Sequence, residues 1–287
     1  MTQTPLFNTA QLGIKYYLNG FPKSGLHLLD LLIRPLAKPM PYDHFVAPWV
    51  GTFAANSWRY ERLPLNQTTL GIGRTPEGFF TKGHLGYLPL FEQFLFYLGI
   101  VHIFIYRDFR DVAISQTYHL LYETDDDKGK EMKVALKHPG KDQLRQLGGF
   151  DEILMGIIGG IDIYPGVMAR WEQYERWLDI NWVLSLSFEE ARLDPHGVAE
   201  EVIDHTVERM GRILTKTPTI DANTKRQMVN SMVDSSRQTH KSLTFRKGAV
   251  GDWKDHFTEE HVAAFKLSDR TNALVRLGYE EDEDWSP

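Results

Sequence analysis

The chain has 287 residues, a formal net charge of −6 and an isoelectric point near 6.0. This length and a hydrophobic content of 42% suit one large α/β domain or two small ones. The acidic balance argues against general nucleic-acid binding, and the lack of cysteine excludes disulfides, thiolate metal sites and cysteine nucleophiles. No signal peptide and no apolar run of membrane-spanning length is apparent, so we expect a cytoplasmic protein without a membrane span.

The first predicted element is a strand, loop and helix between Ile14 and Ile33, and Pro35 ends the helix. The loop contains Gly20, Pro22, Lys23, Ser24 and Gly25. A tight loop that leads into a helix N-terminus presents several backbone N–H groups to an anion, and a lysine and a hydroxyl add to that attraction. We therefore interpret the loop as an anion site. The alternative is an ordinary turn with a solvated lysine.

The spacing of Gly20 and Gly25 suggests a nucleoside-triphosphate P-loop, but that motif needs Lys and Ser or Thr after its second glycine. Leu26 and His27 stand there instead. The loop therefore has no hydroxyl in the place that holds Mg²⁺.

Residues 35–60 are rich in proline and aromatic residues, and Trp49, Phe53 and Trp58 either line a small-molecule pocket or pack against the core. A short strand at Phe79 and Phe80 follows, and then Lys82, Gly83 and His84. Ligands of parallel sheets lie beyond the carboxyl ends of the strands, where His84 falls. A histidine there acts either as a base or as a structural hydrogen-bonding residue.

A helix over Leu88–Leu98 precedes an apolar strand, Val101–Tyr106, of the kind that is buried on both faces. Asp108 is the expected N-cap of the next helix. Arg107 and Ser115 either converge on an anion, or Arg107 pairs locally with Asp111.

Residues 123–163 are first charged and then glycine-rich, which suggests a mobile cap or a surface insertion. A helical stripe follows at Val167, Trp171, Tyr174 and Leu178. Another strand is expected over Trp182–Phe188. This alternation predicts a single α/β domain with a central parallel sheet flanked by helices.

Residues 196–234 are expected to be mostly helical. Arg246 and Lys247 then stand beside Gly248 and Gly251, a pattern that indicates a second anion site. A last helix from about Glu259 to Leu277 leads to an acidic tail, 280–287, which we expect to be solvated.

Three stretches in this order resemble the cytosolic-type sulfotransferases that use 3′-phosphoadenosine 5′-phosphosulfate (PAPS). They are Phe21-Pro22-Lys23-Ser24-Gly25, the segment Tyr106–Ser115, and Phe245–Lys254, with Thr81-Lys82-Gly83-His84 between the first two. The resemblance covers about residues 14–258. It implies one sulfotransferase domain over residues 1–287, with a P-loop-like phosphosulfate-binding loop.

The resemblance also implies the site. His84 would be the general base, Lys23 would lie on the bridging oxygen, and Lys82 would lie near the sulfonate. The residues that would bind the nucleotide are Lys23, Ser24, Gly25, Leu26, His27, Arg107, Ser115, Phe188, Ser235, Arg246, Lys247 and Gly248. The implied reaction takes sulfonate from PAPS to a hydroxyl, or alternatively an amine, of a small-molecule acceptor. It leaves 3′-phosphoadenosine 5′-phosphate (PAP) and needs no metal.

The chain departs from the family around adenine. Leu28 replaces a stacking tryptophan, Phe188 replaces a tyrosine, and Arg237 stands where a second aromatic residue is usual. Two other functions stay open: a P-loop-type kinase that uses ATP, and a non-catalytic nucleotide-binding module. The oligomeric state is open as well.

Overall fold

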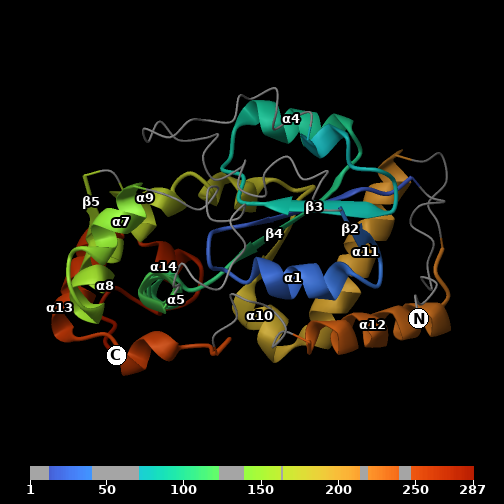
Figure 1. The fold of residues 1–287 in the computed structure, drawn as a ribbon. Helices are drawn as coiled ribbons and strands as arrows, with labels where there is room; N and C mark the ends of the chain where they lie inside the picture. Colours follow the sequence, from blue (N-terminus) through green and yellow to red (C-terminus); the bar gives the residue numbers. More distant parts are fainter. Residues whose placement is uncertain (1–12, 41–70, 123–138, 163, 214–218, 239–246) are drawn as a thin grey trace. The chain divides into compact units, whose positions relative to one another are not determined.

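The computed structural model describes residues 13–40, 71–122, 139–162, 164–213, 219–238 and 247–287 (Figure 1). The chain forms two compact units, one from residues 1–106 and 174–245 and the other from residues 107–173 and 246–287. Trp49, Phe53, Trp58 and Arg246 lie outside the described residues.

The first unit is built on a five-stranded sheet. Its strands, in chain order, are β1 (Tyr16–Gly20), β2 (Lys38–Pro39), β3 (Phe79–Gly83), β4 (Val101–Tyr106) and β7 (Leu184–Ser187). They lie in the order β2-β3-β1-β4-β7, and every neighbouring pair is parallel. The loops after β1 and β3 therefore leave the sheet at the same edge, and the predicted α/β fold with a central parallel sheet is confirmed.

One face of this sheet is covered by helices (Figure 1). These are α1 (Leu26–Ile33), α10 (Phe188–Leu193), α11 (Pro195–Ile213) and α12 (Ala222–Ser236). Alternate residues of β1, Tyr16 and Leu18, point into this core, because successive side chains of a strand face opposite sides. The helices α11 and α12 confirm the predicted helical region.

The opposite face carries the other residues of the central strands. Tyr17 of β1 packs against His102 of β4, and His102 contacts the ring of Trp177. Figure 1 shows α4 (Pro89–Tyr97) on this side of the sheet. Leu88 and Leu98 cap α4, so the predicted helix Leu88–Leu98 is confirmed.

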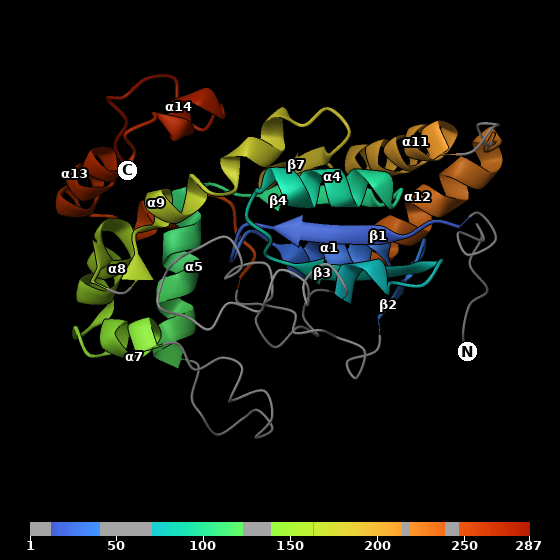
Figure 2. The same ribbon diagram turned by 90° about the horizontal axis from the view of Figure 1, so that it is seen from above.

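The second unit is mainly helical (Figure 2). Its elements are α5 (Phe109–Tyr122), α7 (Pro139–Arg145), α8 (Phe150–Gly159), β5 (Gly160–Ile161), β6 (Tyr164–Pro165), α9 (Val167–Trp171), the 3₁₀ helix η4 (Asp252–Asp255), α13 (Glu259–Ser268) and α14 (Ala273–Arg276). The helix α8 buries Ile153, Leu154, Ile157 and Ile158 and packs against α5 and α13. The described part of the segment 123–163 is thus mostly helical, and its role as a mobile cap or a surface insertion stays a prediction.

The predicted helical stripe from Val167 to Leu178 is broken. It forms α9 and then a separate 3₁₀ helix, η2 (Glu175–Asp179). The Tyr174 hydroxyl donates to the His84 carbonyl at 3.1 Å, and Trp177 Nε1 donates to the Leu85 carbonyl at 2.8 Å. Trp177 is therefore buried, whereas the predicted stripe had Leu178 on its buried face.

Two other boundaries differ from the prediction. The strand expected over 182–188 ends at Ser187, because the Ser187 side chain caps α10 by accepting from the Glu190 N–H. The expected last helix breaks after α13, where Asp269 accepts from the N–H groups of Ala273 and Leu274 and starts α14.

Most of the C-terminal tail is exposed, as predicted, but two of its residues pack against other side chains. Residues 281–284 are exposed, but Trp285 is buried and Glu280 forms an ion pair with the buried Arg110. The Arg110 guanidinium lies over the rings of Trp253 and Trp285. The tail is therefore packed onto the rest of the second unit at Glu280 and Trp285, while residues 286 and 287 are exposed.

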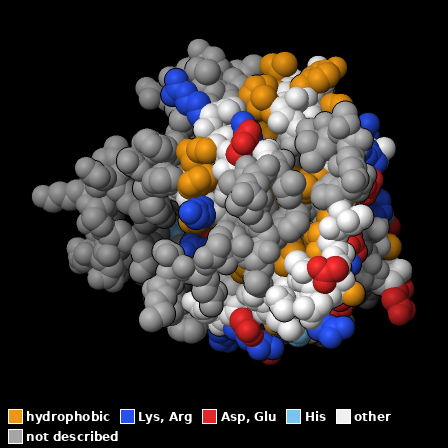
Figure 3. All heavy atoms as spheres, turned by 90° about the vertical axis from the view of Figure 1, so that its right-hand side faces the viewer, with side chains coloured by type: hydrophobic (Ala, Val, Ile, Leu, Met, Phe, Trp, Pro, Cys, Tyr) orange, Lys and Arg blue, Asp and Glu red, His pale blue; other side chains and the backbone are white. Residues whose placement is uncertain are grey.

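The described surface carries mixed charge. On the face in Figure 3, the described Lys and Arg side chains are interspersed with Asp and Glu. None of the helices in the described part of the chain is long and apolar enough to cross a membrane.

Candidate active site

The first cluster of predicted residues lies in the loop between β1 and α1. Lys23 and Gly25 have positive φ angles of 71° and 95°, so the chain turns sharply at both residues. A side chain at Gly25 would collide with the ring of Phe188. Gly25 precedes α1, and among the described residues no side chain caps that helix. The first two N–H groups of α1, those of Leu26 and His27, therefore have no side-chain cap among the described residues, which agrees with the predicted anion site.

Ser24 lies fully buried inside this loop. Its hydroxyl has no hydrogen-bond partner among the described residues. A buried hydroxyl without a partner costs roughly 1–3 kcal/mol, so this position suits a ligand oxygen that would satisfy it. The loop and its lysine thus agree with the predicted anion site.

Lys82 belongs to an ion-pair cluster on the same unit. Its ammonium group pairs with the carboxylate of Asp30, a buried residue of α1. Arg34 Nε lies 2.7 Å from the other oxygen of Asp30. Burial acts to raise the pKa of Asp30, but the charges of Lys82 and Arg34 outweigh burial and hold the pKa below its usual range. An ionised carboxylate therefore lies beside the lysine that we predicted to act near the sulfonate.

His84 directly follows the end of β3 and is buried. Its Nδ1 lies 2.7 Å from the carbonyl oxygen of Gly20, at the end of β1. A carbonyl only accepts, so Nδ1 carries the proton and the lone pair of the ring is on Nε2. Burial lowers the pKa of His84 to about 4, and the nearby positive charges of Lys23 and Lys82 act in the same direction. The ring is therefore neutral at pH 7 and is able to accept a proton.

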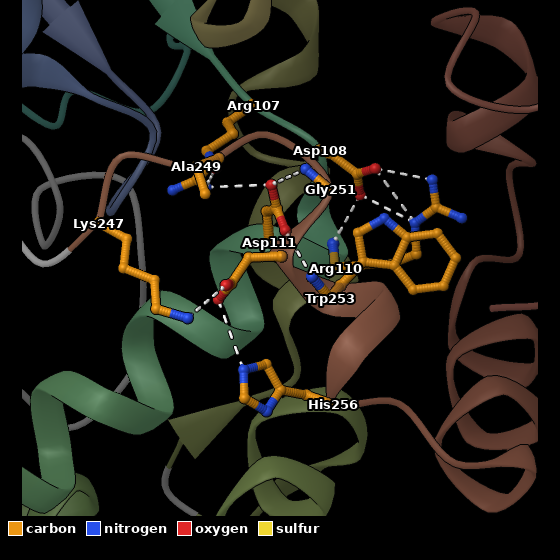
Figure 4. Close-up of polar contacts among 10 residues, drawn as sticks. Arg107, Asp108, Arg110, Asp111, Lys247, Ala249, Gly251, Trp253 and His256 are labelled. Atoms are coloured by element: carbon orange, nitrogen blue, oxygen red, sulfur yellow. Dashed lines mark hydrogen bonds and ion pairs between the residues drawn. The ribbon is translucent and has the colours of Figure 1, made fainter.

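A second cluster of predicted residues follows β4 in the chain and lies within the second unit (Figure 4). Arg107 Nη2 lies 3.0 Å from Asp111 Oδ2 and donates to the carbonyl of Ala249 at 2.6 Å. The local ion pair that the sequence left as an alternative is therefore present. The bond to Ala249 also attaches Arg107 to the loop that contains Gly248 and Gly251.

Asp111 holds this loop in place (Figure 4). Its two oxygens accept from the N–H groups of Gly251 and Trp253, both at 2.9 Å. Lys247 in the same loop lies 3.2 Å from Asp252, and its side chain is 56% exposed. Asp108 accepts from the Arg110 N–H at 2.9 Å, which confirms the expected helix cap.

The remaining predicted residues occupy different environments. Leu26, Ser115 and Gly248 are half-buried, and His27 is exposed. Phe188 is buried in the core that covers the sheet, and Ser235 donates to the Leu31 carbonyl at 2.6 Å. Arg237 is exposed and pairs with Asp234. Among the described residues, no cluster of His, Asp and Glu could hold a metal ion.

Sequence reasoning missed two polar residues of the site, Asn19 and Asp30. Both stand inside apolar runs, Tyr-Tyr-Leu-Asn-Gly of β1 and Leu-His-Leu-Leu-Asp-Leu-Leu-Ile of α1. A polar residue buried within such a run needs partners, and that signal was available.

The five-stranded parallel sheet, with a loop that contains Lys23 and Gly25 after its central strand, defines an α/β protein. The family model described as "Sulfotransferase domain" matches residues 18–268. The chain therefore belongs to the sulfotransferase family.

Individual relatives agree with this assignment. The chain is similar to mouse sulfotransferase 2A2, with 25% identity over 260 residues that cover 85% of this chain and 79% of the relative. Bovine sulfotransferase 1A1 is 25% identical over 84% of this chain and 77% of its own length. A flavonol 4′-sulfotransferase from Flaveria chlorifolia is 23% identical over 85% of this chain and 74% of its own length.

Solved structures show the same fold. Mouse sulfotransferase SULT7A1, in complex with PAP, aligns over 96% of this chain and 92% of its own, with a TM-score of 0.57 and 17% identity. Retinol dehydratase, in complex with retinol and PAP, aligns over 98% of this chain and 86% of its own. The TM-score is 0.52 and the identity is 13%. The expected reaction class, a sulfotransferase that uses PAPS, is confirmed.

Proposed function

We propose that this sulfotransferase moves the sulfonate of PAPS to a hydroxyl group of a small-molecule acceptor, with His84 as the general base. The hydrogen bond from His84 Nδ1 to the Gly20 carbonyl carries the proposal. It gives the imidazole the tautomer that accepts a proton at Nε2, at the same edge of the sheet as the Lys23 loop. A base placed in this way contributes roughly 10²–10⁴-fold to the rate.

The loop after β1 would hold the 5′-phosphosulfate. The donor supplies an activated sulfonate on a phosphate leaving group. Lys23 and the first N–H groups of α1 would stabilise negative charge on that leaving group, and preorganised charge of this kind is usually the largest catalytic term. The buried Ser24 hydroxyl fits the same role because it has no partner among the described residues. Lys82 would stabilise the sulfonate.

Arg107, Ser115, Lys247 and Gly248 would hold the 3′-phosphate, together with Arg246. In support, Asp111 orders the loop that contains Lys247 and Gly248, and Arg107 is attached to the same loop through Ala249. Arg107 pairs with Asp111, so the phosphate would share the guanidinium with that carboxylate.

We propose contacts of Leu26, His27, Phe188 and Ser235 with the nucleotide on family resemblance alone. The Phe188 ring packs on Gly25, so it would support the loop from behind as well as contact the ligand. Relatives named for a flavonol and for a 3-beta-hydroxysteroid suggest a hydroxylated ring compound as the acceptor. An amine is the alternative acceptor, and the cytoplasm is the proposed location.

The test is PAPS-dependent sulfation of a panel of hydroxylated and amine acceptors, followed by mass detection of the product. We expect His84→Ala to lower kcat at least about 100-fold while PAP still binds with its normal affinity in calorimetry. His196→Ala, which changes an exposed histidine, is the matched control. Full turnover by His84→Ala would show that another group is the base. Selective Mg²⁺-dependent binding of ATP over PAP would instead support a kinase.

A further inference from the structure

Asn19 is a fully buried amide in β1, one residue before the phosphosulfate loop begins. Its Oδ1 accepts from the N–H of Leu85 at 2.7 Å and from the N–H of Gly20 at 3.0 Å. Its Nδ2 donates to the carbonyl of Leu85 at 3.0 Å. The orientation of the amide is unambiguous, because two backbone donors face the oxygen and a carbonyl faces the NH₂ group.

These three bonds join the two segments that position the proposed base. One segment contains Gly20, whose carbonyl accepts from His84 Nδ1. The other contains Leu85, the residue after His84. Asn19 therefore binds the backbone next to both partners of the Gly20–His84 hydrogen bond. A shift of either segment would strain the Asn19 bonds first.

The end of β3 explains why an amide is needed here. The parallel pairing of β1 with β3 ends where Asn19 lies opposite Gly83, and beyond that point the chain leaves the sheet. A side-chain amide offers a donor and an acceptor in one plane, as a peptide group does. Asn19 thus extends the hydrogen bonding between the two strands as far as Leu85. It thereby fixes the backbone on both sides of His84.

Two other side chains hold the same segment. The Tyr174 hydroxyl donates to the His84 carbonyl, and Trp177 Nε1 donates to the Leu85 carbonyl. Both bonds secure the segment after β3, and Asn19 adds the bond to the loop after β1. The position of the His84 imidazole is therefore fixed by bonds to the ends of both β1 and β3.

We propose that Asn19 is a positioning residue for His84: it fixes the tautomer in which Nδ1 is protonated and Nε2 accepts a proton. This inference rests on the proposed function, in which His84 is the base. Among the described residues, the Asn19 amide forms hydrogen bonds only with backbone groups, so it acts through the imidazole.

The direct test is the nitrogen NMR spectrum of the His84 ring in the free, ¹⁵N-labelled protein, assigned with His84→Ala. In the unaltered chain at pH 7 we expect a protonated Nδ1 and an unprotonated Nε2. Asn19→Leu removes all three bonds at similar size, and we expect a mixture of both tautomers. We also expect kcat to fall about 10–100-fold, with PAP affinity changed less than about threefold.

Two further variants keep the test decisive. Asn19→Asp retains both accepted bonds but sets a carboxylate oxygen against the Leu85 carbonyl, so it should partly lose the tautomer and lose less of kcat than Asn19→Leu. It decides the question if Asn19→Leu does not fold. Tyr17→Phe removes a hydroxyl from the same strand and the same face of the sheet, and it should leave the ring spectrum unchanged. A folded Asn19→Leu protein with the original tautomer overturns the proposal, as does an Asn19→Asp protein whose tautomer population and kcat both equal those of the unaltered chain.

The ring spectrum needs no turnover, so the two proposals can fail separately. If His84→Ala keeps full activity while Asn19→Leu still changes the tautomer, the role of His84 as base is wrong and the positioning by Asn19 stands. If His84→Ala is inactive and Asn19→Leu leaves the tautomer intact, only the role of Asn19 is wrong.

Discussion

The carboxylate of Asp111 accepts a hydrogen bond from the backbone N–H of Trp253 at 2.9 Å, across 142 positions of sequence. The other oxygen of Asp111 binds the Gly251 N–H and the Arg107 guanidinium. One buried side chain of α5 therefore orders the loop that contains two of the residues proposed to hold the 3′-phosphate.

Asp111→Asn should weaken PAP binding without a comparable loss of kcat at saturating donor. The amide keeps one acceptor, but it leaves a backbone N–H without its partner and Arg107 without its counter-charge. We expect the Kd for PAP to rise about 10–100-fold, measured by calorimetry. Asp142→Asn, at an exposed pair with Arg145, is the control. An unchanged Kd would mean that the loop holds its shape without Asp111.

Asp30→Asn should strengthen binding of PAPS, because the Asp30 carboxylate competes with the donor for Lys82. Removing one negative charge from an anion site is expected to tighten the donor Kd about 3–10-fold at low salt, and less at high salt. Calorimetry with PAPS at two salt concentrations measures the effect. Asp179→Asn removes an exposed carboxylate and should change nothing. Equal affinity of the Asp30 variant and the unaltered chain at low salt would contradict the competition.

The activity should stay nearly constant with pH across the range in which an ordinary histidine titrates. The pKa of His84 is lowered to about 4, mainly by burial, so the ring is neutral above that pH. The acid limb of kcat/KM is expected near pH 4 instead of 6.5, and kcat/KM should change less than about twofold between pH 6 and 8. Circular dichroism at each pH checks that the protein stays folded. A half-maximal kcat/KM near pH 6.5 would show that His84 is not shielded in solution.

His102 should make the fold acid-sensitive. Its ring is fully buried, both ring nitrogens lack hydrogen-bond partners among the described residues, and burial lowers its pKa to about 3. The folded pKa lies below the unfolded value of 6.5, so the stability is complete above pH 6.5 and is lost as the pH falls toward 3. At pH 5 the loss from this residue amounts to about 2 kcal/mol.

His102→Phe should therefore lose about 2 kcal/mol less of its unfolding free energy than the unaltered chain between pH 7 and pH 5. Urea unfolding at the two pH values measures the difference. His196→Phe, at an exposed position, controls for the loss of a histidine. If both variants lose the same free energy as the unaltered chain, His102 is solvated or bonded in solution.

The local patterns in the sequence were sufficient for the central strands, for the loop around Gly25 and for the position of His84 at the end of β3. They failed where distant residues decide the local structure. The stripe at Trp171 and Tyr174 has a helical period, yet bonds to His84 and Leu85 break it into two short helices. The Asp30–Lys82 pair joins residues 52 positions apart and leaves no local trace.

The partners of Arg107 could be predicted only in part from the sequence. The sequence offered an anion site or a local pair with Asp111, and the structure contains the pair while also attaching Arg107 to the loop after residue 246. The anion site stays a proposal. The Asp111 side chain binds both Arg107 and the loop, and the four-residue spacing alone could not reveal the contact with Gly251.

Each compact unit is assembled from two stretches that are far apart in the chain. A continuous fragment that ends at residue 173 lacks β7, α10, α11 and α12, and with them the helices that bury Tyr16 and Leu18. We therefore expect that neither unit can be obtained as an independently folding piece by cutting the chain once.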